Sequence, residues 1–167
     1  IHSHIRRYLI FALPSPAMSP TSPATPRPDR RRAVATLAAL PLAAMGLSMG
    51  CHRTWMLSAA SDRIAAGAAI CWMGTTEALM APGNNQTGGH SSYSMLVPGL
   101  RNYLDYPDVA SIACPKPMLF YNGDQDGLFP VKGVQDAYAK LHRVWAGRNA
   151  DDKLITRLWP RPHVFDV

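Results

Sequence analysis

The 167-residue sequence predicts an α/β fold, in which helices pack against a mostly parallel β-sheet. Short apolar runs of strand length alternate along the chain with segments whose apolar residues recur at helical spacing. A composition of 47% hydrophobic and 17% charged residues is typical of a globular protein. The length suffices for one domain with a hydrophobic core.

Four apolar runs are predicted to be strands. They cover residues 40–46 ("LPLAAMG"), 63–73 ("RIAAGAAICWM"), 116–123 ("KPMLFYNG") and 152–160 ("DKLITRLWP"). The third is the clearest, because its apolar and aromatic residues run up to an Asn-Gly pair that favours a turn. The fourth alternates apolar and polar residues, as a half-buried strand does.

Helices are predicted between these strands, over residues 51–60, within 97–113 and over 131–147. The last of these carries an apolar stripe at helical spacing, which predicts a face packed on the core. The stripe consists of Val134, Ala137, Tyr138, Leu141 and Trp145. Residues 74–97 are too long for a simple connection, so we expect a lid or a substrate-facing insertion there.

Residues 1–35 are rich in Pro, Ser and Arg, and irregular or disordered structure is expected there. Residues 1–50 carry +5 of the formal charge of +6, which leaves the rest of the chain nearly neutral. A nucleic-acid-binding domain would carry a basic stripe on its folded body, so no nucleic-acid partner is expected. The uncharged run 33–50 is Ala-rich and broken by Pro41, so no membrane span is expected.

Chemistry-bearing residues follow three of the predicted strands. Ser48 lies in Gly-Leu-Ser-Met-Gly after the first strand, Asp124 and Asp126 follow the third, and His163 follows the fourth. The carboxyl ends of parallel strands share one edge of a sheet, where sites are commonly built. A serine hydroxyl becomes a nucleophile when an imidazole takes its proton and a carboxylate orients that imidazole. The pattern therefore predicts a Ser-His-Asp site.

Steric crowding is the reason expected for the two glycines that flank Ser48. A turn sharp enough to expose a serine between a strand and a helix leaves no room for side chains two residues away on either side. The helix that follows directs free N–H groups toward the site, where they favour a developing oxyanion. The backbone N–H of Met49 is the expected first donor.

The segments "GLSMGCHRTWML", "PGNNQT", "LDYPDVASIACPKPMLFYNGDQDGLFP" and "LWPRPHVF" resemble the α/β-hydrolase superfamily. Within it, the chain is similar to dienelactone hydrolase-like and acetyl xylan esterase-like serine esterases, over about residues 42–167. The resemblance implies an ester hydrolase with Ser48 as nucleophile, His163 as general base and Asp126 as the orienting acid. Asp126 is preferred over Asp124 because the family's acid stands three residues after the strand-ending glycine, here Gly123, and shortly before a proline such as Pro130. A small-molecule or carbohydrate ester is the implied substrate, with no cofactor or metal required.

The chain departs from that family at both ends. Few residues precede Ser48, and four follow His163, so the resemblance predicts an α/β-hydrolase-type sheet truncated at both ends, with a partial domain over 36–167. Two alternatives to an active esterase follow. One is a non-catalytic remnant of a hydrolase. The other is an exported lipoprotein whose signal ends near Cys51, because an Arg-rich segment and an apolar run precede that residue.

Several other residues have both an ordinary and a functional interpretation. His52 is interpreted as a polar residue at a helix start, and His90 as an exposed loop residue. Trp72 is predicted either to line an acyl pocket or to fill the core. Cys71 and Cys114 are expected to be small buried apolar residues. The sequence leaves the oligomeric state open, as well as the choice between the cytoplasm and export.

Overall fold

The computed structural model describes residues 40–84 and 97–165. Its four strands form one parallel sheet in the order β1-β2-β3-β4. The strands are β1 (Leu42–Leu47), β2 (Ile64–Ile70), β3 (Met118–Gly123) and β4 (Leu154–Trp159). The predicted α/β class with a parallel sheet is confirmed. The predicted boundary near residue 35, and His90 in the long insertion, lie outside the described residues.

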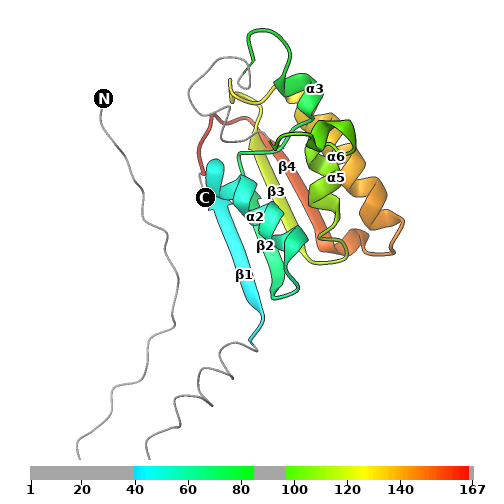
Figure 1. Cartoon of the computed structure of the whole chain (residues 1–167). Coiled ribbons are helices and arrows are strands. Elements are labelled where there is room, and N and C mark those ends of the chain that lie inside the picture. The colour runs from blue at the N-terminus through cyan, green and yellow to red at the C-terminus, as the bar shows by residue number, and fades with distance from the viewer. Residues whose placement is uncertain (1–39, 85–96, 166–167) are drawn as a thin grey trace, which may run out of the picture. The chain divides into compact units, whose positions relative to one another are not determined.

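Helices make the crossovers that parallel strands require. They are α2 (Met49–Ala60), α3 (Thr76–Leu79), α5 (Tyr106–Ser111) and α6 (Val131–Ala146). Figure 1 shows these helices on one side of the sheet. Two short 3-10 turns, η2 (Leu100–Asn102) and η3 (Asp151–Lys153), and helix α3 are additions that the sequence patterns did not predict.

The core lies between the sheet and these helices. Met118 and Phe120 of β3 are 3% and 0% exposed, and the predicted apolar stripe of α6 packs in the same cluster. Residues that alternate with them point to the opposite face of the sheet. There the register partners Met45, Ala68 and Leu119 help to line an apolar groove of about 450 Å³. Within the described residues, that second face is the open one.

The predicted second strand was too long. It was expected to run through Met73, but β2 ends at Ile70 because Cys71 has a φ of 57°. That left-handed backbone is incompatible with an extended strand. The helix expected within 97–113 is α5, which is six residues long and has Pro107 in its first turn. Proline is favoured there, because the first N–H groups of a helix have no partner within it.

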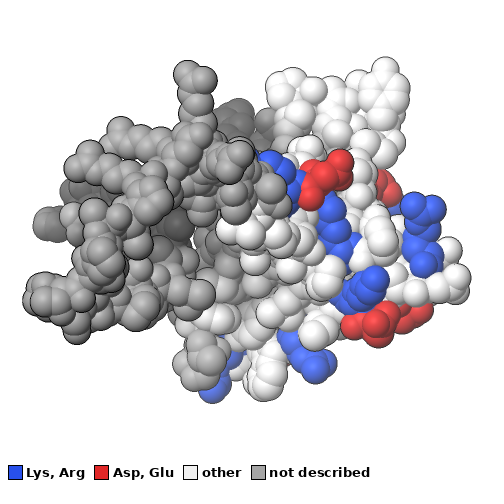
Figure 2. Space-filling model, turned by 90° about the horizontal axis from the view of Figure 1, so that it is seen from below, with Lys and Arg blue, Asp and Glu red and all other residues white. Residues whose placement is uncertain are grey.

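No helix in the described residues is both long and apolar enough to cross a bilayer. Acidic and basic side chains are interspersed on the face of the molecule seen in Figure 2.

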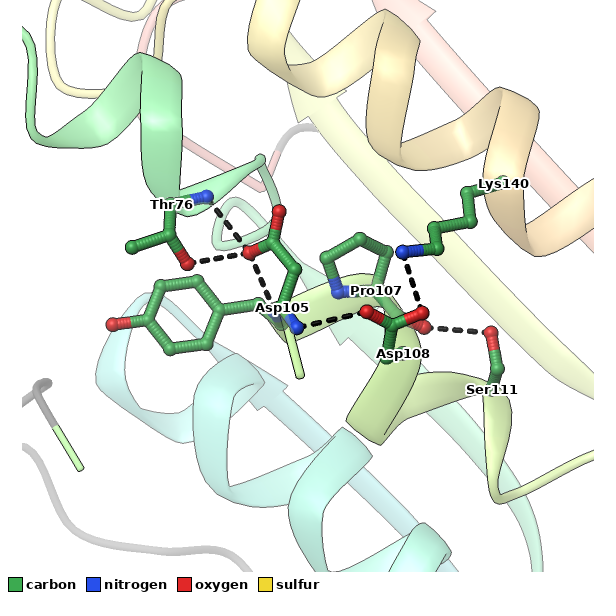
Figure 3. Close-up of polar contacts among 7 residues, drawn as sticks. Thr76, Asp105, Pro107, Asp108, Ser111 and Lys140 are labelled. Atoms are coloured by element: carbon green, nitrogen blue, oxygen red, sulfur yellow. Dashed lines mark hydrogen bonds and ion pairs between the residues drawn. The ribbon is translucent and has the colours of Figure 1, made fainter. Parts of the chain in front are cut away.

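Asp105 joins two helix starts on the connection between β2 and β3 (Figure 3). Its Oδ1 accepts hydrogen bonds from the Thr76 N–H at 2.8 Å, from the Thr76 hydroxyl, and from the Tyr106 N–H at 2.7 Å. Asp108 accepts from the Asp105 N–H at 2.8 Å, which completes a capping box, and forms an ion pair with Lys140 of α6. One carboxylate therefore fixes α3 and α5 to each other.

We expect Asp105→Ala to lower the free energy of unfolding by about 2–3 kcal/mol, because it removes an N-cap and leaves the donors on Thr76 unpaired. Urea denaturation measures the change. Asp62→Ala is the matched control, since Asp62 is exposed and lies beyond the end of α2. That variant should stay within about 0.5 kcal/mol of the wild type. Equal stabilities for the two variants would contradict the bracing role of Asp105.

Candidate active site

Ser48 occupies a strained turn between β1 and α2. Its φ of 57° and ψ of −118° lie outside the regions that a non-glycine residue usually adopts. The Ser48 N–H donates to the Ile70 carbonyl at 2.8 Å, which holds this turn against the end of β2. Serine at a helix N-cap ordinarily accepts a hydrogen bond from the first turn, but the Ser48 side chain makes no such bond. Its hydroxyl is therefore not used to cap α2.

Gly46 allows this turn to be tight. A Cβ built on Gly46 would lie 2.3 Å from the carbonyl carbon and oxygen of Gly50, a distance that real atoms do not reach. The Gly50 position has nothing within 4 Å of such an atom. The close approach thus explains the first glycine of the motif, whereas the steric reason predicted for the second is wrong. Helix α2 begins at Met49, with no acidic residue in its first turn, so its free N–H groups meet no negative side chain of their own helix.

Asp126 and His163 lie in contact after the third and fourth strands. The His163 Nδ1 is 2.6 Å from Asp126 Oδ2, a short charge-assisted distance. The Asp126 side chain is fully buried, and its Oδ1 accepts the Leu128 N–H at 2.9 Å. The His163 side chain is 25% exposed. Asp124, the alternative acid, is exposed, so the structure brings Asp126 rather than Asp124 to His163.

The segment after β4 turns back across the carboxyl edge of the sheet (Figure 1). It crosses β3 so closely that a Cβ on Gly123 would lie 2.0 Å from the Arg161 carbonyl oxygen. Farther along, the Val164 carbonyl accepts from the Cys71 thiol at 3.3 Å, beyond the end of β2. The segment thus carries His163 from the end of β4 toward the side of the sheet where Ser48 lies. In the described part of the chain, no hydrogen bond joins the Ser48 hydroxyl to His163.

Cys71 also belongs to this site, although the sequence predicted only a buried core position for it. Its thiol, the Asp126 carboxylate and a ring nitrogen of His163 lie within 4.8 Å of one another. Burial, with a smaller contribution from the Asp126 charge, raises the pKa of the Cys71 thiol to about 11. The thiol is thus protonated at neutral pH and donates to a carbonyl. The sequence signal that could have placed Cys71 in the site is its position just after a strand. That signal was missed because the predicted strand ran past Cys71.

Aromatic rings connect this site to the core. Phe129 stacks on His163 with ring centroids 6.1 Å apart, and packs edge-on against Trp72 at 5.4 Å. Trp72 is 1% exposed and packs in turn against His52 and Tyr106. Of the two predictions for Trp72, the structure supports a core position, from which it backs the site through Phe129.

His52 is buried among these rings rather than exposed at the helix surface. Burial, assisted by the neighbouring Arg53, lowers the pKa of His52 to about 4, so the ring is neutral at pH 7. Its Nε2 and the Nε1 of Trp72 have no hydrogen-bond partner among the described residues. The Cys51 thiol is fully buried and donates to the Trp72 carbonyl at 3.2 Å. Cys114 is half-buried, and not fully buried as expected.

No family model matches the chain. It is 31% identical over 108 residues to "Putative hydrolase YtaP" of Bacillus subtilis, a match that covers 65% of this chain and 35% of that protein. A carbohydrate esterase family 15 glucuronoyl esterase from Caldicellulosiruptor kristjansonii superposes with a TM-score of 0.60 at 14% identity, covering 72% of this chain and 38% of the esterase. Methylesterase BT1017 superposes with a TM-score of 0.55 at 21% identity, covering 82% of this chain and 30% of the methylesterase.

The chain spans about a third of the length of each of these proteins. Together with the parallel sheet and its strand order, the likenesses identify the fold as that of the α/β-hydrolases. By their names, the matched proteins are a putative hydrolase and two esterases.

The crossing over Gly123 generates a stability prediction. We expect Gly123→Ala to lower the free energy of unfolding by about 1–3 kcal/mol, because the added methyl group collides with the backbone of Arg161. Gly127→Ala is the matched control, since a Cβ there meets nothing within 4 Å. Chemical denaturation of both variants measures the difference. A Gly123→Ala protein as stable as the control would show that the two segments do not approach so closely.

His52 generates a pH prediction. Its ordinary pKa of about 6.5 in the unfolded chain exceeds the value of about 4 in the folded protein. As the pH falls through this interval, the unfolded state gains a proton that the folded state does not, and stability falls by up to about 3 kcal/mol. His52→Gln should lose this contribution, whereas His142→Ala, at an exposed position, should keep it. Urea midpoints at pH 7 and pH 4.5 test this. An unchanged acid sensitivity in His52→Gln would contradict it.

Proposed function

We propose that this chain, which has the α/β-hydrolase fold, carries the catalytic site of a serine hydrolase. The site would cleave carboxylic esters through an acyl-enzyme. The observation that carries the proposal is the 2.6 Å contact between His163 Nδ1 and the buried Asp126 carboxylate. It lies at the same edge of the sheet as the strained turn of Ser48.

In this proposal the Ser48 hydroxyl attacks the ester carbonyl while His163 Nε2 accepts its proton. Asp126 holds the proton on Nδ1 and stabilises the imidazolium that forms. Because Oδ1 of Asp126 already accepts the Leu128 N–H, the carboxylate is fixed before the imidazole becomes charged. Proton transfer requires Ser48 Oγ to come within about 3 Å of His163 Nε2, a contact that often tightens only when substrate binds.

The N-terminus of α2 supplies the electrostatic part of the mechanism. A tetrahedral intermediate at Ser48 would place its oxyanion beside the N–H of Met49, the first residue of the helix. The absence of acidic residues from the first turn leaves the positive end of the helix dipole uncompensated by that helix. His163 would then return its proton to the leaving alcohol, and water would release the acyl group by the same route.

Within esters, we propose small acyl esters of carbohydrates, such as acetylated sugars, as the substrate class. The support is the resemblance of the sequence to acetyl xylan esterase-like proteins, together with the printed names of two fold neighbours, a glucuronoyl esterase and a methylesterase. No described pocket selects among these esters, so the choice rests on similarity alone.

Two alternatives to an active esterase are a non-catalytic remnant and an exported lipoprotein. A non-catalytic remnant of a hydrolase would keep the fold but form no acyl-enzyme. The exported lipoprotein would be processed before Cys51. In the structure Cys51 lies fully buried inside α2, and cleavage before it would remove strand β1 from the sheet and Ser48 from the start of the helix. This position disfavours the lipoprotein.

The proposed function predicts a burst of p-nitrophenol from p-nitrophenyl acetate, followed by slower turnover, as an acyl-enzyme accumulates. Ser48→Ala should abolish the burst and lower kcat by at least about 1,000-fold, because the nucleophile is lost. Asp126→Asn should lower kcat to a similar degree while leaving KM nearly unchanged, since it acts through His163. Stopped-flow absorbance and mass spectrometry of the acetylated protein provide the measurements.

Ser111→Ala is the control, because Ser111 lies in α5 and donates to the Pro107 carbonyl. It should retain the burst. A folded wild-type protein that shows neither a burst nor acetylation would support the non-catalytic remnant. A Ser48→Ala variant as active as the wild type would exclude Ser48 as the nucleophile.

A further inference from the structure

The residues Cys71, Asp126 and His163 bring three kinds of metal-binding atom to one place. A thiol sulfur, a carboxylate oxygen and an imidazole nitrogen lie within 4.8 Å of one another. Each comes from the region after a different strand, so the shared edge of the sheet assembles them. We propose that these three residues form a zinc site, and that Zn²⁺ bound there switches off the hydrolase described above. The inhibitory part of this proposal rests on the proposed function; the binding part does not.

The donor set suits Zn²⁺. Zinc binds thiolate, imidazole and carboxylate ligands, and sites with three protein ligands leave a fourth position for water or a small molecule. Mg²⁺ and Ca²⁺ prefer oxygen ligands alone and would gain little from the sulfur of Cys71. With bond lengths of about 2.0–2.3 Å, a tetrahedral ion needs its donor atoms about 3.3–3.6 Å apart. The present separations, between 2.6 Å and 4.8 Å, approach that range through side-chain shifts of about 1 Å.

Two of the three ligands are already held in place. Cys71 is fixed by the left-handed turn after β2, and its N–H donates to the Tyr121 carbonyl at 2.6 Å. Asp126 is fixed by the Leu128 N–H. Both side chains are buried, whereas the His163 side chain is 25% exposed. A metal ion would therefore enter past His163 and meet a partly preformed pair of ligands beneath it.

Zinc binding changes which atoms of the site carry protons. The Cys71 thiol releases its proton to solvent and its sulfur becomes a thiolate ligand. If zinc takes Nδ1 of His163, the ring proton moves from Nδ1 to Nε2, which can then no longer accept the serine proton, and the bond to Asp126 is broken. If zinc takes Nε2, the lone pair that would accept the serine proton is occupied. Through either nitrogen, His163 can no longer serve as a general base, so inhibition by zinc would compete with proton transfer and be reversed by a chelator.

The test uses the whole chain, freed of metal with EDTA and then desalted. Co²⁺ replaces Zn²⁺ as a spectroscopic probe, because a thiolate ligand gives Co²⁺ a near-ultraviolet charge-transfer band. We expect the wild type to show this band and Zn²⁺ to displace it. Cys71→Ala should lack the band, and His163→Gln should weaken binding at least tenfold. Cys114→Ala is the matched control, since Cys114 lies near the Val144 carbonyl, away from the site, and should keep the band.

The second measurement is hydrolysis of p-nitrophenyl acetate. Wild-type activity should fall with added Zn²⁺ and return with EDTA, while Cys71→Ala should tolerate at least tenfold more Zn²⁺. A wild type without a thiolate band, or a band that survives in Cys71→Ala, would overturn the zinc site. If the chain hydrolyses no ester, the proposed function fails, but the Co²⁺ spectra still decide whether the site binds metal. Binding without inhibition of an active wild type would overturn the inhibitory role.

Discussion

The close passage of the backbone at Arg161 over Gly123 is the constraint on which the arrangement of the site depends. It lets the chain that leaves β4 turn back along the carboxyl edge of the sheet instead of continuing away from it. The bond between His163 and Asp126 and the contact between Cys71 and the Val164 carbonyl both follow from this turn. A side chain at position 123 would hold the two strand ends apart, and the His163 imidazole would separate from the Asp126 carboxylate.

The site depends on packing as well as on backbone geometry. Phe129 stacks on His163 and packs on Trp72, and Trp72 contacts Tyr106, the first residue of α5. Asp105 anchors the start of that helix to α3. A continuous series of contacts therefore runs from the partly exposed imidazole of His163 to the helix layer. The imidazole thus packs against the same core that Asp105 helps to hold together.

The sequence alone was enough to predict the features that depend on residues close together in the chain or on the general geometry of a parallel sheet. The four strands, the apolar stripe of α6 and the Gly-x-Ser-x-Gly turn are local patterns, and the common edge of parallel strands implied that Ser48 and His163 face the same side. The choice of Asp126 over Asp124 came from family resemblance. Local patterns could not reveal that Cys71 ends its strand in a left-handed turn, or that His52 is buried, since rings from separate elements enclose it.

Under the two proposals made above, Cys71 lets the same geometry serve two chemistries. At neutral pH a protonated, buried thiol is a poor nucleophile, so it does not compete with a serine for an ester. The contact that makes Asp126 useful to His163 also places two metal ligands side by side, and the thiol adds a third. A Ser-His-Asp hydrolase with an apolar residue at position 71 would hold only two such donors and would bind zinc weakly. The proposed sensitivity to zinc thus depends on this chain's own cysteine and is separable from the proposed acid–base roles of Asp126 and His163.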